Sequence, residues 1–200
     1  MQTGSTIDKA RLVMFTDALL AIIMTVLVLD IKVPEGLESM SGEECLVTLF
    51  RVFPHFLGFI ISFAFILVLW FAHHDLMEAM HTVNKPFTVL NFCFIGSTAT
   101  LPFSTGLTAA YPTESYAVCT LALNMFIMNV FLAGMFIYAQ RKGISRLDFV
   151  SLRYQRIKRL MGVGGSVLFF LAIFIAFLSP SIALIMIAIV PIIHCLPVPD

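Results

Sequence analysis

Six apolar stretches separated by short polar breaks dominate the pattern of this 200-residue chain. A helix that crosses a bilayer needs about 20 mainly apolar residues, because the hydrocarbon core is about 30 Å thick and each residue adds about 1.5 Å. Proline and glycine mark several breaks, among them Pro34-Glu35-Gly36 and Ser179-Pro180. The pattern therefore predicts six transmembrane helices, at about residues 12–33, 52–73, 87–110, 115–139, 160–178 and 181–196.

The composition indicates that the lipid bilayer is the solvent for the whole chain. Hydrophobic residues make up 60% and charged residues 12%, and the mean hydropathy is +0.98. A soluble domain carries about 25% charged residues. We therefore expect an all-α integral membrane protein, with residues 1–200 forming a single domain and no cleavable signal peptide. The net charge of zero gives no reason to expect a nucleic-acid partner.

The basic residues are distributed unevenly between the two sides of the predicted bundle. Ten of the twelve precede the first or third helix or lie between the fourth and fifth, and only Lys32 and Arg51 lie on the other side. The positive-inside rule then predicts a multi-pass protein of the cell membrane with both termini in the cytoplasm. We interpret the basic segment from Arg141 to Arg159 as topogenic, with a specific lipid or nucleotide site as the alternative.

An acidic residue lies inside the first predicted helix, where an ionisable group costs a few kcal/mol or more. Asp17 is about 8 Å beyond the start of that helix by helical rise. The second helix runs antiparallel to the first, so its end, Trp70-Phe71-Ala72-His73-His74, reaches a similar depth. We expect Asp17 to be a structural carboxylate that accepts hydrogen bonds from Trp70, His73 or His74. Asn91 of the third helix could join them.

Two interpretations of this cluster stay open. It either locks the helices together as a satisfied polar network, or it contacts a passing ion or proton directly. The second would suit a proton- or cation-coupled secondary transporter that uses Asp17 and His73/His74. We expect no metal site, because adjacent histidines point about 100° apart and no spaced third ligand follows. The absence of paired catalytic groups argues against an enzyme.

One stripe of side chains follows Asp17 along the same helix. Ile22, Thr25, Val26 and Leu29 fall at i, i+3, i+4 and i+7 and share a face. Periodicity alone does not decide whether this face contacts lipid, another helix or a pore. The third helix contains Pro102 among several serines and threonines, which indicates a kinked helix in the protein interior.

Three segments resemble the transmembrane protein 175 family of potassium channels. Arg11-xxx-Phe15-Thr16-Asp17 is similar to the family signature Arg-xxx-Phe-Ser-Asp, with a threonine that keeps the hydroxyl group. Trp70-xx-His73-His74 and Leu101-Pro102-Phe103 also resemble the family. We expect these segments to supply a structural polar network with the members Arg11, Phe15, Thr16, Asp17, Trp70, His73, His74 and Asn91.

The resemblance implies a potassium-permeable cation channel that needs no cofactor and lacks a re-entrant filter loop. The sequence contains no TVGYG-like segment. One copy of the signature implies one six-helix repeat per chain and a homotetramer in which the first helices line the pore. Bulky apolar side chains would form the constriction, which assigns Ile22, Val26 and Leu29 to it. Thr25 is then the candidate for coordinating the permeating potassium ion.

Overall fold

The computed structural model describes residues 8–29, 31–36, 38, 41–145 and 152–194, with backbone only for residues 152–161 and 194. Within these ranges the regular structure is helical, with loops between the helices and an isolated bridge between Met80 and Ser145. The predicted all-α class is confirmed. The helices are α1 (Lys9–Leu29), α2 (Gly42–Phe50), α3 (Phe53–Ala79), α4 (Lys85–Ala99), α5 (Leu101–Ala110), α6 (Ser115–Lys142), α7 (Leu152–Leu178) and α8 (Pro180–His194).

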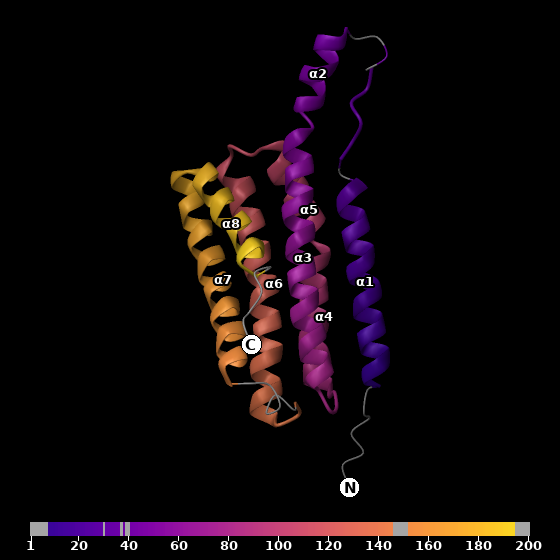
Figure 1. Cartoon of the computed structure of the whole chain (residues 1–200), viewed down its shortest axis with the longest axis vertical. Coiled ribbons are helices and arrows are strands. Elements are labelled where there is room, and N and C mark those ends of the chain that lie inside the picture. The colour runs from indigo at the N-terminus through magenta and orange to yellow at the C-terminus, as the bar shows by residue number, and fades with distance from the viewer. Residues whose placement is uncertain (1–7, 30, 37, 39–40, 146–151, 195–200) are drawn as a thin grey trace.

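The helices stand side by side in one bundle, with α1 at one edge and α7 and α8 at the other (Figure 1). The largest buried side chains come from α1, α3, α4, α5, α6 and α7, so the core runs through the middle of the bundle. Four helical stretches are long and apolar enough to cross a membrane: Lys9–Leu29, Gly42–Ala79, Lys85–Ala110 and Ser115–Lys142. Two shorter apolar helices, Gly162–Leu178 and Pro180–Ile193, complete the six.

Helix α2 has no counterpart among the predicted elements. It extends the line of α3 beyond the end of α1 (Figure 1). A capping box begins it: the Glu44 amide donates to the Ser41 hydroxyl at 3.4 Å, and the Ser41 amide donates to the Glu44 carboxylate at 2.9 Å. These bonds satisfy two amides that a helix start otherwise leaves unpaired. The chain between the first two predicted spans therefore contains a helix where the sequence reading placed a loop.

The third predicted helix is divided at Thr100 into α4 and α5. Pro102 cannot donate an amide hydrogen bond, which frees a carbonyl of the preceding turn. That carbonyl, of Thr98, accepts from the Thr100 amide, and nearby hydroxyl groups donate to other carbonyls of the turn: Thr98 to Phe94 at 2.8 Å and Thr100 to Ser97 at 2.8 Å. The polar side chains buried along this pair are Thr88, Asn91, Thr98, Ser104, Thr105 and Thr108. The expectation of a kinked helix in the protein interior is thus confirmed.

The other ends differ from the prediction by several residues. Helix α1 ends at Leu29 rather than at residue 33, and α3 continues to Ala79 rather than 73. Helix α7 begins at Leu152 rather than 160, because the polar residues before the apolar stretch continue the same helix. Positions 195 and 196 of the sixth predicted span lie outside the described residues.

Close packing of α3 on α5 depends on a glycine. A Cβ atom at Gly58 would lie 3.2 Å from Thr105 Cγ2, and the Thr105 hydroxyl is 2.7 Å from that of Ser62. We expect Gly58→Val to lower the free energy of unfolding by about 1–3 kcal/mol, because overpacking must shift Thr105 and strain its hydrogen bond. Gly96→Val is the matched control, since a Cβ there meets nothing within 4 Å. Thermal unfolding of the two purified variants checks this, and equal losses would contradict it.

Candidate functional site

One face of α1 is fixed to the rest of the chain. Its buried residues are Leu12, Thr16, Leu20, Ile23 and Leu27, at spacings of four, four, three and four. This spacing places them along one stripe of an α-helix. The stripe packs against α3, α4 and α5, so the opposite face of α1 points away from its own chain.

A chain of hydrogen bonds joins α3 and α4 to this buried stripe. His73 Nε2 lies 2.8 Å from Asn91 Oδ1, Asn91 Nδ2 donates to Thr16 Oγ1 at 2.8 Å, and Thr16 Oγ1 donates to the Leu12 carbonyl at 2.9 Å. Because the Asn91 amide nitrogen donates to Thr16, its oxygen must accept, so His73 Nε2 is a donor. All three side chains are buried. The chain of bonds runs in one direction, from α3 through α4 into the backbone of α1.

Asp17, the next residue on α1, has a separate partner. Trp70 Nε1 donates to Asp17 Oδ1 at 2.9 Å. The Trp70 ring stacks on His74, with ring centroids 5.5 Å apart and an interplanar angle of 26°. His74 Nε2 lies 3.9 Å from a carboxylate oxygen of Glu78, one turn further along α3. This second branch leads from α1 to the exposed end of α3.

A lysine makes a third contact near the start of α1. Lys9 Nζ donates to the carbonyl of Met80, the C-cap residue of α3, at 2.7 Å. A cation at the C-terminus of a helix also interacts favourably with the helix dipole. The polar contacts between α1 and the rest of the chain therefore begin at its first residue.

The predicted network is divided between these branches. Trp70 is the donor to Asp17, as the sequence indicates, whereas His73 bonds to Asn91 instead. Adjacent helical residues point about 100° apart, so His73 and His74 cannot both turn toward one carboxylate. Of the signature residues, Arg11 is exposed, and Phe15 packs edge-on against Phe92 at 5.8 Å.

The outward face of α1 carries the predicted constriction residues. The exposed fractions are 56% for Ile22, 41% for Val26 and 72% for Leu29, and Thr25 is exposed as well. Thr25 Oγ1 donates to the carbonyl of Ile22 at 2.7 Å, which leaves the lone pairs of the hydroxyl oxygen for another partner. Among the described residues, no group of three or more His, Cys, Asp or Glu side chains could hold a metal ion.

Similarity to known proteins is strongest over the part of the chain that contains both branches. Residues 11–102 match the family described as endosomal/lysosomal potassium channel TMEM175. A potassium channel of Chryseobacterium sp. (strain P1-3) is 35% identical over 97 residues, which cover 48% of this chain and 47% of the relative. A potassium channel of Streptomyces collinus is 26% identical over 189 residues, covering 88% and 86%. The chain thus spans about half the length of the first of these relatives and most of the second.

The fold is also that of a solved structure. The crystal structure of a lysosomal potassium-selective channel TMEM175 homologue from Chamaesiphon minutus superposes with a TM-score of 0.79 and covers 94% of this chain and 96% of its own. The sequence identity in this comparison is 23%, so it shows the shared fold alone. With the match over residues 11–102 and the relatives that carry the same segment, this chain is similar to the TMEM175 family over that part of its length.

Proposed function

We propose that this chain forms a potassium-permeable cation channel whose pore is lined by α1. The single observation that carries the proposal is the division of α1 into two faces. One face is held by buried hydrogen bonds, and the other is exposed, apolar and supplied with one hydroxyl group. The names of the Chryseobacterium and Streptomyces relatives, both potassium channels, support this function. Neither name supports the transporter alternative built on Asp17 and His73/His74.

The channel proposal requires more than one copy of the chain. Helix α1 lies at the edge of the bundle (Figure 1), so one copy cannot enclose a path behind it. Four copies around an axis would bring together the four outward faces of α1, each with Ile22, Thr25, Val26 and Leu29. Residues 1–200 of each copy would form one six-helix transmembrane domain. The homotetramer is consistent with the single copy of the signature at Arg11 to Asp17.

The constriction would be a ring of Ile22 side chains, continued by Val26 and Leu29. Such a ring leaves little room for a hydrated ion and offers no oxygen atom to a bare one. Passage is then limited by dewetting of the neck and by the cost of removing water from the ion. Thr25 lies between these apolar residues, and its hydroxyl oxygen can replace part of the hydration shell of potassium. So few ligands predict a modest preference for potassium over sodium.

The chain would lie in the cell membrane with both termini in the cytoplasm. Support comes from the basic residues, since Lys9, Lys85, Arg141 and Lys142 all belong to the helix ends opposite to α2. Glu35 lies at the α2 end, where acidic residues would raise the local concentration of cations near the mouth of the pore. Asp30 and positions 146–151 lie outside the described residues.

Asp17 would act as a structural carboxylate rather than as an ion ligand. Its Oδ1 atom already accepts the Trp70 hydrogen bond, and this bond ties α1 to α3 at the depth where the helices must align. An indole N–H left without an acceptor away from water costs about 1–3 kcal/mol. The hydrogen bonds of Asp17 and Thr16 would therefore set the position of α1, and the outward face with Ile22, Thr25, Val26 and Leu29 would contact the ion.

The assembly can be tested by crosslinking two neighbouring positions on α1. In a background without Cys45, Cys93, Cys119 and Cys195, we expect Leu29→Cys to give a ladder of crosslinked species up to the tetramer. Val28→Cys is the matched control, because Val28 is also exposed but lies about 100° around the helix. A short bismaleimide and gel electrophoresis give the readout. Equal or stronger crosslinking at Val28 would show that the face with Ile22, Thr25, Val26 and Leu29 does not point toward the axis.

The constriction can be tested by potassium flux into liposomes. We expect Ile22→Asn to raise flux about tenfold, which corresponds to about 1.4 kcal/mol on the barrier, and to weaken the preference for potassium over sodium. Val28→Asn is the control, since its exposed fraction of 46% is close to the 56% of Ile22. Ile23 is a poor control because it is buried, so truncation there also opens a cavity. A larger effect at Val28 would place another face of α1 on the axis.

The role of Asp17 can be tested with two substitutions. Asp17→Asn keeps an acceptor for the Trp70 indole, so we expect it to cost about 1 kcal/mol of stability, whereas Asp17→Leu leaves the donor unpaired and costs more. The tetramer fraction from size-exclusion chromatography and the thermal midpoint should fall in that order, with the potassium-to-sodium preference unchanged. A well-assembled Asp17→Asn tetramer with altered ion preference would instead indicate direct contact with the ion.

A further inference from the structure

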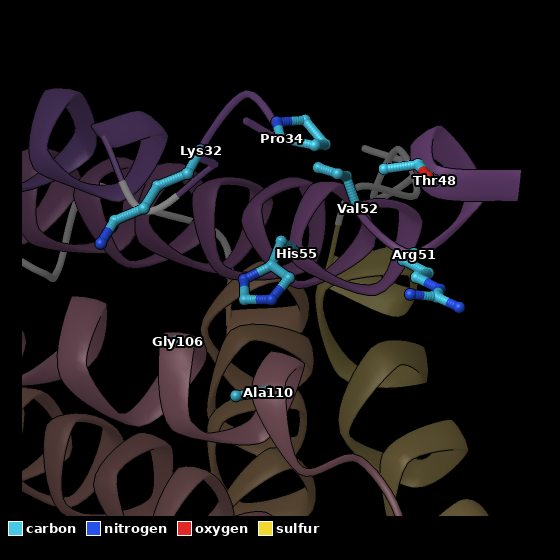
Figure 2. A pocket seen from close by; sticks show the side chains of 8 residues that line it. All are labelled: Lys32, Pro34, Thr48, Arg51, Val52, His55, Gly106 and Ala110. Atoms are coloured by element: carbon cyan, nitrogen blue, oxygen red, sulfur yellow. The ribbon is translucent and has the colours of Figure 1, made fainter. Parts of the chain in front are cut away.

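An open cavity of about 390 Å³ lies at the α2 end of the bundle, away from the hydrogen-bond network of α1 (Figure 2). Four parts of the chain enclose it: the segment after α1, helix α2, the first turn of α3, and α5. Its lining residues are Lys32, Pro34, Thr48, Arg51, Val52, His55, Gly106 and Ala110.

Positive charge is concentrated in this cavity. Lys32 and Arg51 are the two basic residues that the sequence places on this side of the membrane, and both line it although 19 positions separate them. His55 adds a third nitrogen-bearing side chain. Figure 2 shows its ring between Lys32 and Arg51, directed toward α5. The described lining contains no carboxylate that would neutralise these groups.

Helix α5 leaves room opposite His55. It contributes Gly106 and Ala110, whose small size keeps the space beneath the histidine ring open. The cavity also lies at the predicted start of the second membrane span, near residue 52, which is the depth of lipid headgroups. Basic side chains at such a depth often extend into the interface one by one. Here, however, two of them come from separate elements to the rim of one hollow, where the Lys32 and Arg51 side chains extend to opposite sides of His55 (Figure 2).

We infer that this cavity binds a phosphate group, either a free phosphate ion or the phosphate of a lipid headgroup. Arginine can donate two parallel hydrogen bonds to phosphate oxygens, and lysine supplies a compact positive charge. His55 can donate a further hydrogen bond from its ring. The site is independent of the channel proposal, because binding is measured on purified protein without any ion flux.

The test is a titration of the purified full-length protein in uncharged detergent with inorganic phosphate. Potassium chloride keeps the ionic strength constant, and thermal unfolding is followed by the fluorescence of Trp70, the single tryptophan. A ligand that binds only the folded state raises the midpoint with concentration. We expect a saturable rise of a few degrees in the wild type, and a rise reduced by more than half in Arg51→Gln and Lys32→Gln.

Two further variants separate a built site from a general salt effect. Ala110→Phe should abolish the rise, because it fills the cavity and leaves every charge in place. Lys142→Gln removes an exposed lysine at the opposite end of the bundle and should leave the rise unchanged. Phosphate also stabilises proteins by exclusion from their surface. An equal rise in all variants would reveal that effect alone and overturn the proposal.

A second titration distinguishes the two sources of the phosphate group. Mixed micelles with dioleoyl phosphatidylglycerol are compared with micelles that contain the same amount of an uncharged diacylglycerol. A response to phosphatidylglycerol alone, lost in Arg51→Gln and Ala110→Phe, assigns the site to a lipid headgroup. A response to inorganic phosphate alone assigns it to a soluble ion. No variant-sensitive response to either probe would mean that the cavity is not a phosphate site.

Discussion

The buried hydrogen bonds from His73 through Asn91 to Thr16 impose the constraint on which the position of α1 depends. Inside a membrane, polar groups without partners are costly, since no bulk water can satisfy them. Each hydrogen bond in this series has a definite donor, and the last one ends on the backbone carbonyl of Leu12. Rotation of α1 by even one residue would remove Thr16 from Asn91. The network therefore selects one face of α1 for the interior and leaves the opposite face outward.

The two faces of α1 have different surroundings: one packs against the same chain, and the other is exposed. Leu20, Ile23 and Leu27 continue the inward face with apolar packing after the hydrogen bonds end. On the outward face, Ile22, Val26 and Leu29 are exposed beyond their own chain. In a soluble protein such exposure would be a liability. In a membrane, the same residues can contact lipid or an equivalent helix, which makes an assembly through this face possible.

Much of this arrangement could be predicted from the sequence. The apolar lengths predict six crossing helices, and the depth of Asp17 within the first one requires a donor from a neighbour. Antiparallel geometry then indicates Trp70, His73 or His74, and the structure shows Trp70 as that donor. These inferences succeed because they rest on strong physical costs, namely the burial of charge and the thickness of the bilayer.

Other features depended on information that a periodic pattern does not carry. Helical spacing could not assign His73 to Asn91 rather than to Asp17, because that choice depends on the rotation of α3 against α4. Helix α2 begins with a local capping box, Ser41 to Glu44, and its apolar stretch is too short to cross a bilayer, so a search for membrane spans passes over it. Pro102 signals the break at Thr100, yet the pattern does not show that the Thr100 amide is the donor to the freed Thr98 carbonyl.

The polar contacts of α1 all lie near one end of the helix. Lys9, Thr16 and Asp17 fall within about 12 Å of helix length, and the remaining 18 Å or so to Leu29 is held in the described part of the chain by packing alone. Such a helix can tilt about a point near Asp17, where its hydrogen bonds hold it. A given angle of tilt displaces Leu29 about 2.4 times as far as Ile22, in proportion to distance from Asp17. The far end of α1 can therefore move by exchanging apolar contacts, while Ile22 stays close to its place.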